Sequence, residues 1–230
     1  MSVNHEIKDL TPQVKICGLT RVDEAVACVA LGADAIGLIF YPQSPRYVTA
    51  AQAEEISRAL PVSVCTVGVF VDETFDNILR TAQSARLNAV QLHGVESPEL
   101  VERLCNEELK VIKTLFTNRK PFYTEASHFP ATAFLVECGD GSLPGGNARA
   151  WDFSLLKDFG KNFPLILAGG LSVNNIIEAV DQSQPDAVDI SSGVEASPGQ
   201  KDLSKVKAFI KTTQKTRIVK PNRRIFYVHN

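Results

Sequence analysis

The 230-residue sequence has few of the residues that would indicate a metal site or a disulfide framework. Its five cysteines, at positions 17, 28, 65, 105 and 138, are odd in number and form no C-x-x-C pair, and its four histidines are also dispersed. Neither a disulfide scaffold nor a zinc site of usual spacing is therefore expected. We predict that the chain holds no metal and keeps free thiols in a reducing compartment.

Long apolar runs and an excess of one charge are also missing. No apolar stretch approaches the ~20 residues of a membrane helix, and the N-terminal stretch MSVNHEIKDLTPQ lacks the apolar core of a signal peptide. The formal net charge of -2 gives no sign of a surface that binds nucleic acid. These features predict a cytoplasmic protein that binds neither membranes nor nucleic acid.

The sequence does contain a regular alternation of strand and helix patterns. Stretches of helical period separate eight short β-rich apolar runs, at residues 14–17, 35–41, 64–70, 89–92, 110–115, 133–137, 164–168 and 187–190. Near-continuous apolar runs are typical of parallel strands that are covered on both faces. Repeated βα units therefore predict a parallel sheet, and the weakest of the helical stretches is the one at about 120–128.

Eight βα units in a chain of this length match an α/β protein of the (β/α)8 barrel class, folded as a single domain over residues 14–215. Residues 1–13 are expected to form an N-terminal extension. Residues 216–230 are expected to be a basic and aromatic tail that covers the barrel base, joins a partner or is disordered. The structural alternative is a doubly wound open sheet, but the first run ends in CGLTR rather than in a G-x-G-x-x-G turn.

Polar residues and glycines stand where the predicted strands end, which is where barrel enzymes place their active sites. The side chains at or near these positions are Cys17, Arg46, Gln91, His93, Glu137 and Asp189. The loops after the seventh and eighth runs, LAGGLS and DISSG, supply Gly169, Gly170, Ser191, Ser192 and Gly193. Barrels often bind phosphate with these two loops, and backbone N–H groups near a helix start attract anions, so we expect a phosphate site there.

Each of these residues also has a purely structural interpretation. Cys17 could be a small buried hydrophobe, and Glu137 could be an exposed charge at a strand end. Arg46 could form a surface ion pair instead of binding a substrate carboxylate with two hydrogen bonds. His93 could line the site or be a core histidine, and the two glycine loops could be a tight turn and a helix cap. The residues alone leave these alternatives open.

Taken together, several segments of the chain resemble the phosphoribosylanthranilate isomerase family. They are VKICGLTR, GADAIGLIFYPQSPRYV, TVGVFVDE, AVQLHG, PGG, LILAGGLSVNN and VDISSGVEASPGQKD, in this order between about residues 14 and 213. The likeness involves nearly every loop that follows a predicted strand, which makes it more specific than any one motif.

The resemblance implies a barrel enzyme of tryptophan biosynthesis that uses no cofactor and no metal. Its reaction is the Amadori rearrangement of N-(5-phosphoribosyl)anthranilate to 1-(2-carboxyphenylamino)-1-deoxyribulose 5-phosphate. The resemblance also implies that Cys17 is the general base, that Glu137 is the general acid and that Arg46 binds the anthranilate carboxylate. The GG and SSG loops would bind the phosphate. The expected partner is the small phosphoribosyl substrate, and the chain is expected to act as a monomer or a homodimer.

The chain departs from the family pattern in one region. The family usually has aspartate where this chain has Glu137, and its usual GGTGKTFDW reads GGNARAWDF here. Two other functions are therefore considered. One is a related phosphoribosyl sugar isomerase, such as the histidine-pathway enzyme, although Cys17 replaces the first aspartate of that design. The other is a non-catalytic barrel that binds phosphoribosyl ligands.

Overall fold

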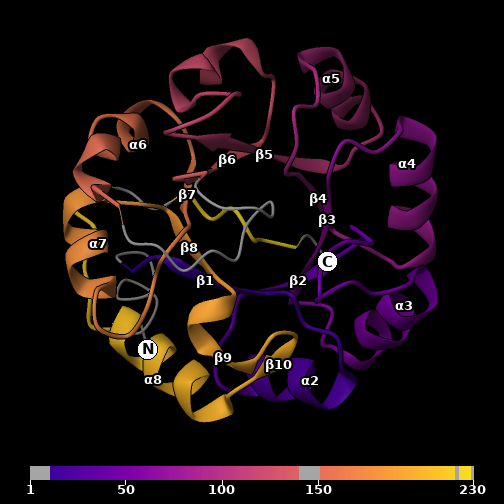
Figure 1. Cartoon of the computed structure of the whole chain (residues 1–230), viewed down its shortest axis with the longest axis horizontal. Coiled ribbons are helices and arrows are strands. Elements are labelled where there is room, and N and C mark those ends of the chain that lie inside the picture. The colour runs from indigo at the N-terminus through magenta and orange to yellow at the C-terminus, as the bar shows by residue number, and fades with distance from the viewer. Residues whose placement is uncertain (1–10, 140–150, 221–222, 229–230) are drawn as a thin grey trace.

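Eight parallel strands form a closed barrel in the computed structural model, which describes residues 11–139, 151–220 and 223–228. The strands pair in chain order, and β8 returns to pair with β1 (Figure 1). The strands are β1 (Gln13–Cys17), β2 (Ala35–Ile39), β3 (Cys65–Phe70), β4 (Ala89–Leu92), β5 (Lys110–Phe116), β6 (Ala133–Glu137), β7 (Leu165–Leu167) and β8 (Ala187–Ile190). The predicted fold class is confirmed, and each predicted run overlaps a strand.

Helices surround the barrel as an outer ring (Figure 1). They are α2 (Val22–Ala30), α3 (Ala50–Ala59), α4 (Phe75–Ser84), α5 (Pro98–Asn106), α6 (Phe159–Asn162), α7 (Ile176–Ser183) and α8 (Leu203–Thr213). Side-chain caps from Thr49, Ser97 and Asp202 start α3, α5 and α8 by accepting backbone N–H groups.

Short 3-10 helices and one hairpin complete the described elements. The weak helical stretch after the fifth strand is the 3-10 helix η1 (Tyr123–His128). Two more 3-10 helices, η2 (Phe153–Leu156) and η3 (Ser192–Val194), follow β6 and β8. The hairpin of β9 (Glu195–Ser197) and β10 (Gln200–Lys201) precedes α8. Within the described residues, no helix is both long enough and apolar enough to cross a bilayer.

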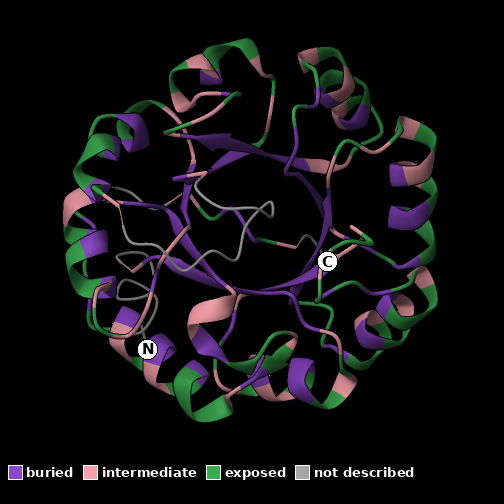
Figure 2. Cartoon of the chain, in the orientation of Figure 1, coloured by how far each residue is buried: buried purple, intermediate pink, exposed green. Residues whose placement is uncertain are grey.

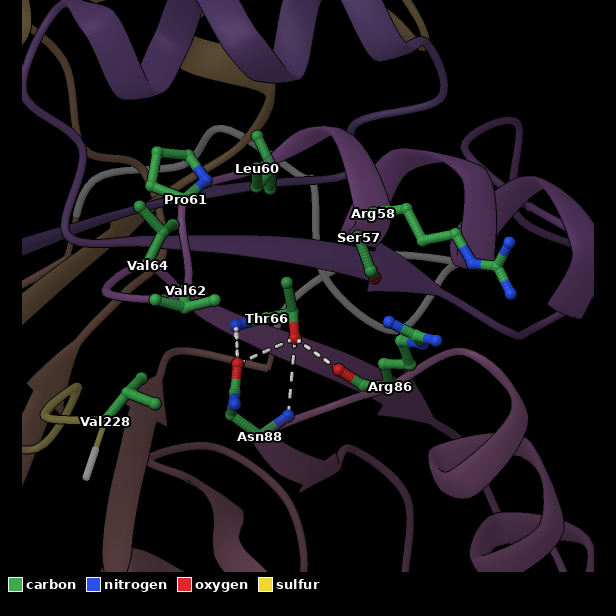
Figure 3. Close-up of a pocket in the computed structure, with 10 residues that line it drawn as sticks. All are labelled: Ser57, Arg58, Leu60, Pro61, Val62, Val64, Thr66, Arg86, Asn88 and Val228. Carbon is green, nitrogen blue, oxygen red and sulfur yellow. Dashed lines mark hydrogen bonds between the residues drawn. The ribbon is translucent and has the colours of Figure 1, made fainter. Parts of the chain in front are cut away.

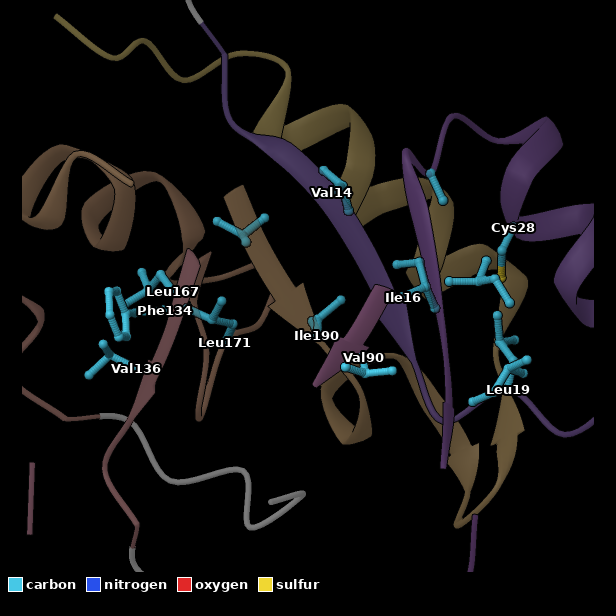
Figure 4. Packing of buried hydrophobic residues seen from close by; sticks show 14 of the residues in the cluster. Val14, Ile16, Leu19, Cys28, Val90, Phe134, Val136, Leu167, Leu171 and Ile190 are labelled. Carbon is cyan, nitrogen blue, oxygen red and sulfur yellow. The ribbon is translucent and has the colours of Figure 1, made fainter. Parts of the chain in front are cut away.

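The strands are buried on both faces, as Figure 2 shows in purple. One face packs against the helices through residues such as Val14, Ile16, Phe134 and Ile190 (Figure 4). The alternate residues point into the barrel, where a second cluster includes Ala35, Cys65, Val67, Ala89, Ile112, Ala133, Leu135, Ile166 and Ala187. This arrangement explains why the strand sequences are nearly continuous apolar runs instead of alternating ones.

The described part of the C-terminal tail packs under the amino end of the barrel. Ile225 and Phe226 join the interior cluster and are 8% and 2% exposed. The Phe226 N–H donates over 3.0 Å to Oε1 of Gln13, the first residue of β1. Arg223 donates to the carbonyl oxygens of Gly160 and Phe163 over 3.0 and 2.8 Å. Three roles were considered for the tail, and residues 223–226 have one of them: they cover the base of the barrel.

Candidate active site

The interior of the barrel changes from apolar to polar toward the carboxyl ends of the strands. Cys17 ends β1 and Glu137 ends β6, and each is 6% exposed. These two strands lie across the ring from one another, with β7 and β8 between them on one side and β2 to β5 on the other (Figure 1). A molecule bound in this mouth would lie between a thiol and a carboxyl group.

Cys17 lies next to a buried lysine. Lys15 precedes it by two residues on the same face of β1, is fully buried, and places Nζ 2.9 Å from Asp189 Oδ1. A Cβ built on Gly37 of β2 would lie 2.6 Å from Cys17 Sγ and 3.1 Å from Lys15 Nζ. The thiol and the ammonium therefore both pack against the bare backbone of this glycine.

The charges around Cys17 act in opposite directions on its thiol. Burial raises the pKa of Cys17, and the Asp189 carboxylate adds to this, while the ammonium groups of Lys15 and Lys201 lower it. The pKa of Cys17 stands above its ordinary value as a result. Burial by itself lowers the pKa of Lys15, but Asp189 and Cys17 outweigh it and raise that pKa, so Lys15 is an ammonium at neutral pH.

Lys15 is a residue that the sequence reasoning missed. It stands in the motif VKIC, two positions before Cys17. In a strand, residues two apart share one face, so a lysine in a buried run with this spacing signals a charge beside the cysteine. Asp189, predicted only as a lining residue, is the partner of this lysine.

Glu137 is held by a histidine from β4's carboxyl end. His93 Nε2 lies 3.3 Å from Glu137 Oε1, and His93 Nδ1 lies 2.8 Å from Gln91 Nε2 and 3.2 Å from Thr114 Oγ1. In the tautomer with the proton on Nε2, Gln91 donates to Nδ1 and His93 donates to Glu137. The structure thus brings the predicted residues Gln91, His93 and Glu137 into one hydrogen-bonded row.

Trp151 lies beside the carboxyl group and the glycine loop. Its Nε1 donates to the Ala168 carbonyl over 3.2 Å. A Cβ built on Gly169 would lie 3.1 Å from both Trp151 Nε1 and Glu137 Cβ. Trp151 belongs to the stretch GGNARAWDF that departs from the family pattern, and residues 145–150 of that stretch lie outside the described residues.

The two loops predicted to bind phosphate lie against each other. Gly169 and Gly170 follow β7 with φ angles of +84° and +66°, a left-handed conformation that favours glycine. A Cβ on Gly193 would lie only 2.3 Å from the Leu171 carbonyl oxygen, so the second loop contacts the first. Within the part of the chain that the structure describes, the N–H groups of Gly169, Gly170, Ser192 and Gly193 donate no hydrogen bond.

The helices near these loops differ from the expectation. The first loop does not run directly into a helix, because Asn175 forms a turn in which its Oδ1 accepts the Ser172 N–H and its Nδ2 donates to the Gly170 carbonyl. Helix α7 begins only at Ile176. The second loop continues into η3, which is a single short turn. Ser191 lies next to Lys201, whose Nζ donates to the Ser191 carbonyl over 3.3 Å.

Arg46 forms a buried ion pair in the loop between β2 and α3. Its Nε and Nη2 donate to the two carboxylate oxygens of Glu195 over 2.8 and 2.7 Å, and Lys201 donates to the same carboxylate over 2.7 Å. The hydrogen bonds to Glu195 raise the pKa of Arg46 further. Nη1 has no hydrogen-bond partner among the described residues. Arg46 also packs on the loop after Cys17, because a Cβ on Gly18 would lie 2.5 Å from its Cδ.

A separate pocket of about 560 Å³ lies at the other end of the barrel (Figure 3). Its lining includes residues that precede β3 and β4, together with Val228 of the tail. The polar groups of Thr66 and Asn88 are hydrogen-bonded to each other there, since the Thr66 N–H and hydroxyl both donate to Asn88 Oδ1. This pocket is therefore distinct from the mouth that contains Cys17 and Glu137.

Comparison with known proteins identifies the family. The model of a family described as N-(5′-phosphoribosyl)anthranilate (PRA) isomerase matches residues 14–212. The chain belongs to this family. It is 48% identical over 214 residues to the N-(5′-phosphoribosyl)anthranilate isomerase of Desulfatibacillum aliphaticivorans, covering 93% of this chain and 98% of that protein.

Solved structures of PRA isomerases share the fold. The crystal structure of the Thermotoga maritima enzyme superimposes with a TM-score of 0.81 at 40% identity, covering 88% of this chain and 98% of the other. A complex of a PRA isomerase with reduced 1-(o-carboxyphenylamino)-1-deoxyribulose 5-phosphate gives a TM-score of 0.78 at 40% identity, with the same coverage of both chains. The predictions of an isomerase and of its family are confirmed. The PRA isomerase match contains all the candidate residues and ends before the tail that covers the barrel base.

Proposed function

We propose that the chain catalyses the Amadori rearrangement of N-(5-phosphoribosyl)anthranilate in tryptophan biosynthesis, with Cys17 as general base and Glu137 as general acid. Family membership supports the reaction. The observation that carries the assignment of roles is the placement of Cys17 and Glu137 across one barrel mouth from each other. Two proton-transfer groups on opposite sides of a substrate are what this rearrangement needs.

The proposed binding mode anchors the substrate at both ends. The phosphate would accept hydrogen bonds from the N–H groups of Gly169, Gly170, Ser192 and Gly193, with Ser191 in the same loop. The anthranilate carboxylate would bind Nη1 of Arg46, the guanidinium nitrogen that the pair with Glu195 leaves without a described partner. Two anchors fix the ribose between them and reduce the entropy lost on reaching the transition state.

The acid step comes first in this proposal. Glu137, in its protonated form, donates to the ring oxygen while the C1′–O bond breaks and the nitrogen lone pair forms a C=N bond. The product of this step is an open-chain Schiff base with a positive charge on its protonated nitrogen, balanced by the new Glu137 carboxylate. The His93 N–H at 3.3 Å is placed to stabilise that carboxylate.

The base step follows on the other side of the mouth. The Cys17 thiolate removes the proton from C2′, and the electron pair of the broken C–H bond neutralises the Schiff base to give an enolamine. Tautomerisation of the enolamine then yields the ketone of the product. Cys17 and Glu137 exchange one proton each with the substrate, so neither step requires a metal or a redox partner.

Substitutions of the two groups test the proposal. We expect Cys17→Ala and Glu137→Gln each to lower kcat by ~10²- to 10⁴-fold, the usual worth of one proton-transfer group. Both variants should still bind the reduced product analogue, because the phosphate and carboxylate anchors remain. Binding is measurable through Trp151, which is the single tryptophan of the sequence and lies beside Glu137.

The matched control is Cys105→Ala, which removes a thiol from the outer helix α5 and should leave kcat unchanged. A Cys17→Ala enzyme with wild-type kcat would refute the assignment of the base. Tight binding without turnover in the unmodified chain, unchanged by Glu137→Asp, would instead support a non-catalytic ligand-binding barrel. The expectation of a monomer or a homodimer stays a prediction.

A further inference from the structure

Lys15 is a charged side chain enclosed by the barrel, and the proposed reaction steps give it no role. Its relative exposure is 0%. Lysines are rarely buried this completely, because removing an ammonium from water costs several kcal/mol unless a partner compensates. The compensating partner is Asp189 of β8, whose Oδ1 lies 2.9 Å from Lys15 Nζ. Asp189 is itself mostly buried, so the pair is held inside the protein.

The position of Lys15 relates it to Cys17. Both side chains point inward from β1 and both contact Gly37, whose missing Cβ would lie 2.6 Å from Sγ and 3.1 Å from Nζ. The ammonium therefore lies close to the thiol while it donates to Asp189. The carboxylate thus fixes the ammonium on one side, and the ammonium faces the sulfur on the other.

Four charged groups act on the sulfur from the elements packed against it. They are Lys15 on β1, Asp189 on β8, Lys201 on β10 and Arg46 in the loop after β2. Lys201 and Arg46 share the carboxylate of Glu195, which offsets part of their charge. Of the four, Lys15 is the one whose charged atom packs together with the sulfur against Gly37.

We propose that Lys15 is a positioning residue, whose ammonium is held by Asp189 and hydrogen-bonds to the Cys17 thiolate, so that the sulfur is available as the base. This inference rests on the proposed function, in which Cys17 removes the C2′ proton. The C2′ proton goes to sulfur and gives a neutral thiol, while Lys15 keeps all its protons throughout. The raised pKa of Lys15 agrees with this permanent charge.

The direction of the effect follows from electrostatics. A cation in contact with a thiolate favours the charged form, so removing the cation raises the pKa of the thiol. Burial already raises the pKa of Cys17. Without Lys15 the thiolate fraction at a fixed pH should fall further, and the base step should slow in the same proportion.

The experiment compares Lys15→Met with the unmodified enzyme by two readouts. The first is the ultraviolet absorbance of the thiolate as a function of pH, taken as the difference between each protein and its own Cys17→Ala derivative. The subtraction removes the other thiols, including Cys28 and Cys65, whose pKa values burial raises to about 11 and about 12. The second readout is the pH profile of kcat/KM.

We expect Lys15→Met to move the Cys17 titration and the rising limb of kcat/KM upward by the same amount, at least about one pH unit or tenfold in rate. KM for the substrate should change little. The control is Lys113→Met, which removes another fully buried lysine. Lys113 lies on β5, away from Cys17, and its Nζ is 2.7 Å from Glu96 Oε2. This variant should leave the Cys17 titration unchanged.

Loss of the lysine leaves Asp189 buried without its partner, so Lys15→Met/Asp189→Asn is the second variant if the single substitution does not fold. In the double variant the pKa of Cys17 should also shift upward, because the Lys15 ammonium acts on the thiol more strongly than the Asp189 carboxylate does. An unchanged Cys17 titration in a folded variant would overturn the proposal for Lys15 and leave Cys17 as the base. Wild-type turnover in Cys17→Ala would overturn the proposed function itself, whatever the titration shows.

Discussion

Gly37 offers a direct test of how closely the base must be placed. Replacing it with alanine adds one methyl group against the sulfur, at 2.6 Å from Cys17 Sγ and 3.1 Å from the α-carbon of Cys17. Heavy atoms pack at roughly 3.5–4.0 Å, so the methyl group and the sulfur overlap by about 1 Å. The α-carbon belongs to the backbone of β1 and cannot swing away, so the thiol itself has to move.

The expected magnitude follows from that displacement. A misplacement of about 1 Å at a reacting group costs on the order of 10²-fold in rate. Overpacking of a core position costs about 1–3 kcal/mol of the free energy of unfolding. We therefore expect Gly37→Ala to fold, with a moderate loss of stability in urea denaturation and a fall of about 10²-fold in kcat/KM.

The matched control is Gly68→Ala on the neighbouring strand β3. A Cβ there would lie 2.4 Å from Leu87 Cδ1, on the helix-facing side of the sheet. This variant should lose stability to a similar degree and keep its kcat/KM. If Gly37→Ala lost no more activity than Gly68→Ala, the close placement of Cys17 against Gly37 would not matter for catalysis, and the reasoning would be refuted.

Two further predictions concern the carboxylate site and the tail. Arg46→Lys should raise KM by roughly 10- to 100-fold, because lysine cannot keep both hydrogen bonds to Glu195 and also offer an N–H to the substrate. Hydrogen bonds to charged groups contribute about 1.5–3 kcal/mol. An unchanged KM in steady-state kinetics would contradict the binding role of Arg46. Phe226→Ala should lower the free energy of unfolding by about 3–5 kcal/mol while kcat/KM is kept, because the ring is buried at the opposite end of the barrel. Urea denaturation measures this loss, and a change below about 1 kcal/mol would show that the tail is not part of the core.

The strands could be predicted because their signal is local. Each run is nearly continuous in apolar residues, since the helices cover one face and the barrel interior the other. The first strand illustrates the same rule, because the prediction of residues 14–17 lies within Gln13–Cys17. The weakest predicted helix became η1, where no long apolar stripe exists to pack a full α-helix on the sheet.

Interactions between distant residues could not be predicted in this way. Lys15 and Asp189 are 174 positions apart, Arg46 and Glu195 are 149 apart, and His93 and Glu137 are 44 apart. A strand pattern tells which face a side chain occupies, but it does not tell which charge stands opposite. The role of the tail could not be predicted for the same reason, since Phe226 and Gln13, which are hydrogen-bonded, lie 213 positions apart in the sequence.

The sequence by itself thus determined the order and placement of the eight strands and the polar residues at their ends. These features follow from the hydrophobic pattern of a few neighbouring residues, so they can be predicted without knowing any contact between distant residues. Only the tertiary structure decided that Lys15 and Asp189 flank Cys17, that Glu195 holds Arg46 and that the tail covers the base. The physical reason is closure of the ring, which brings β8 beside β1 and turns charges remote in the chain into buried neighbours.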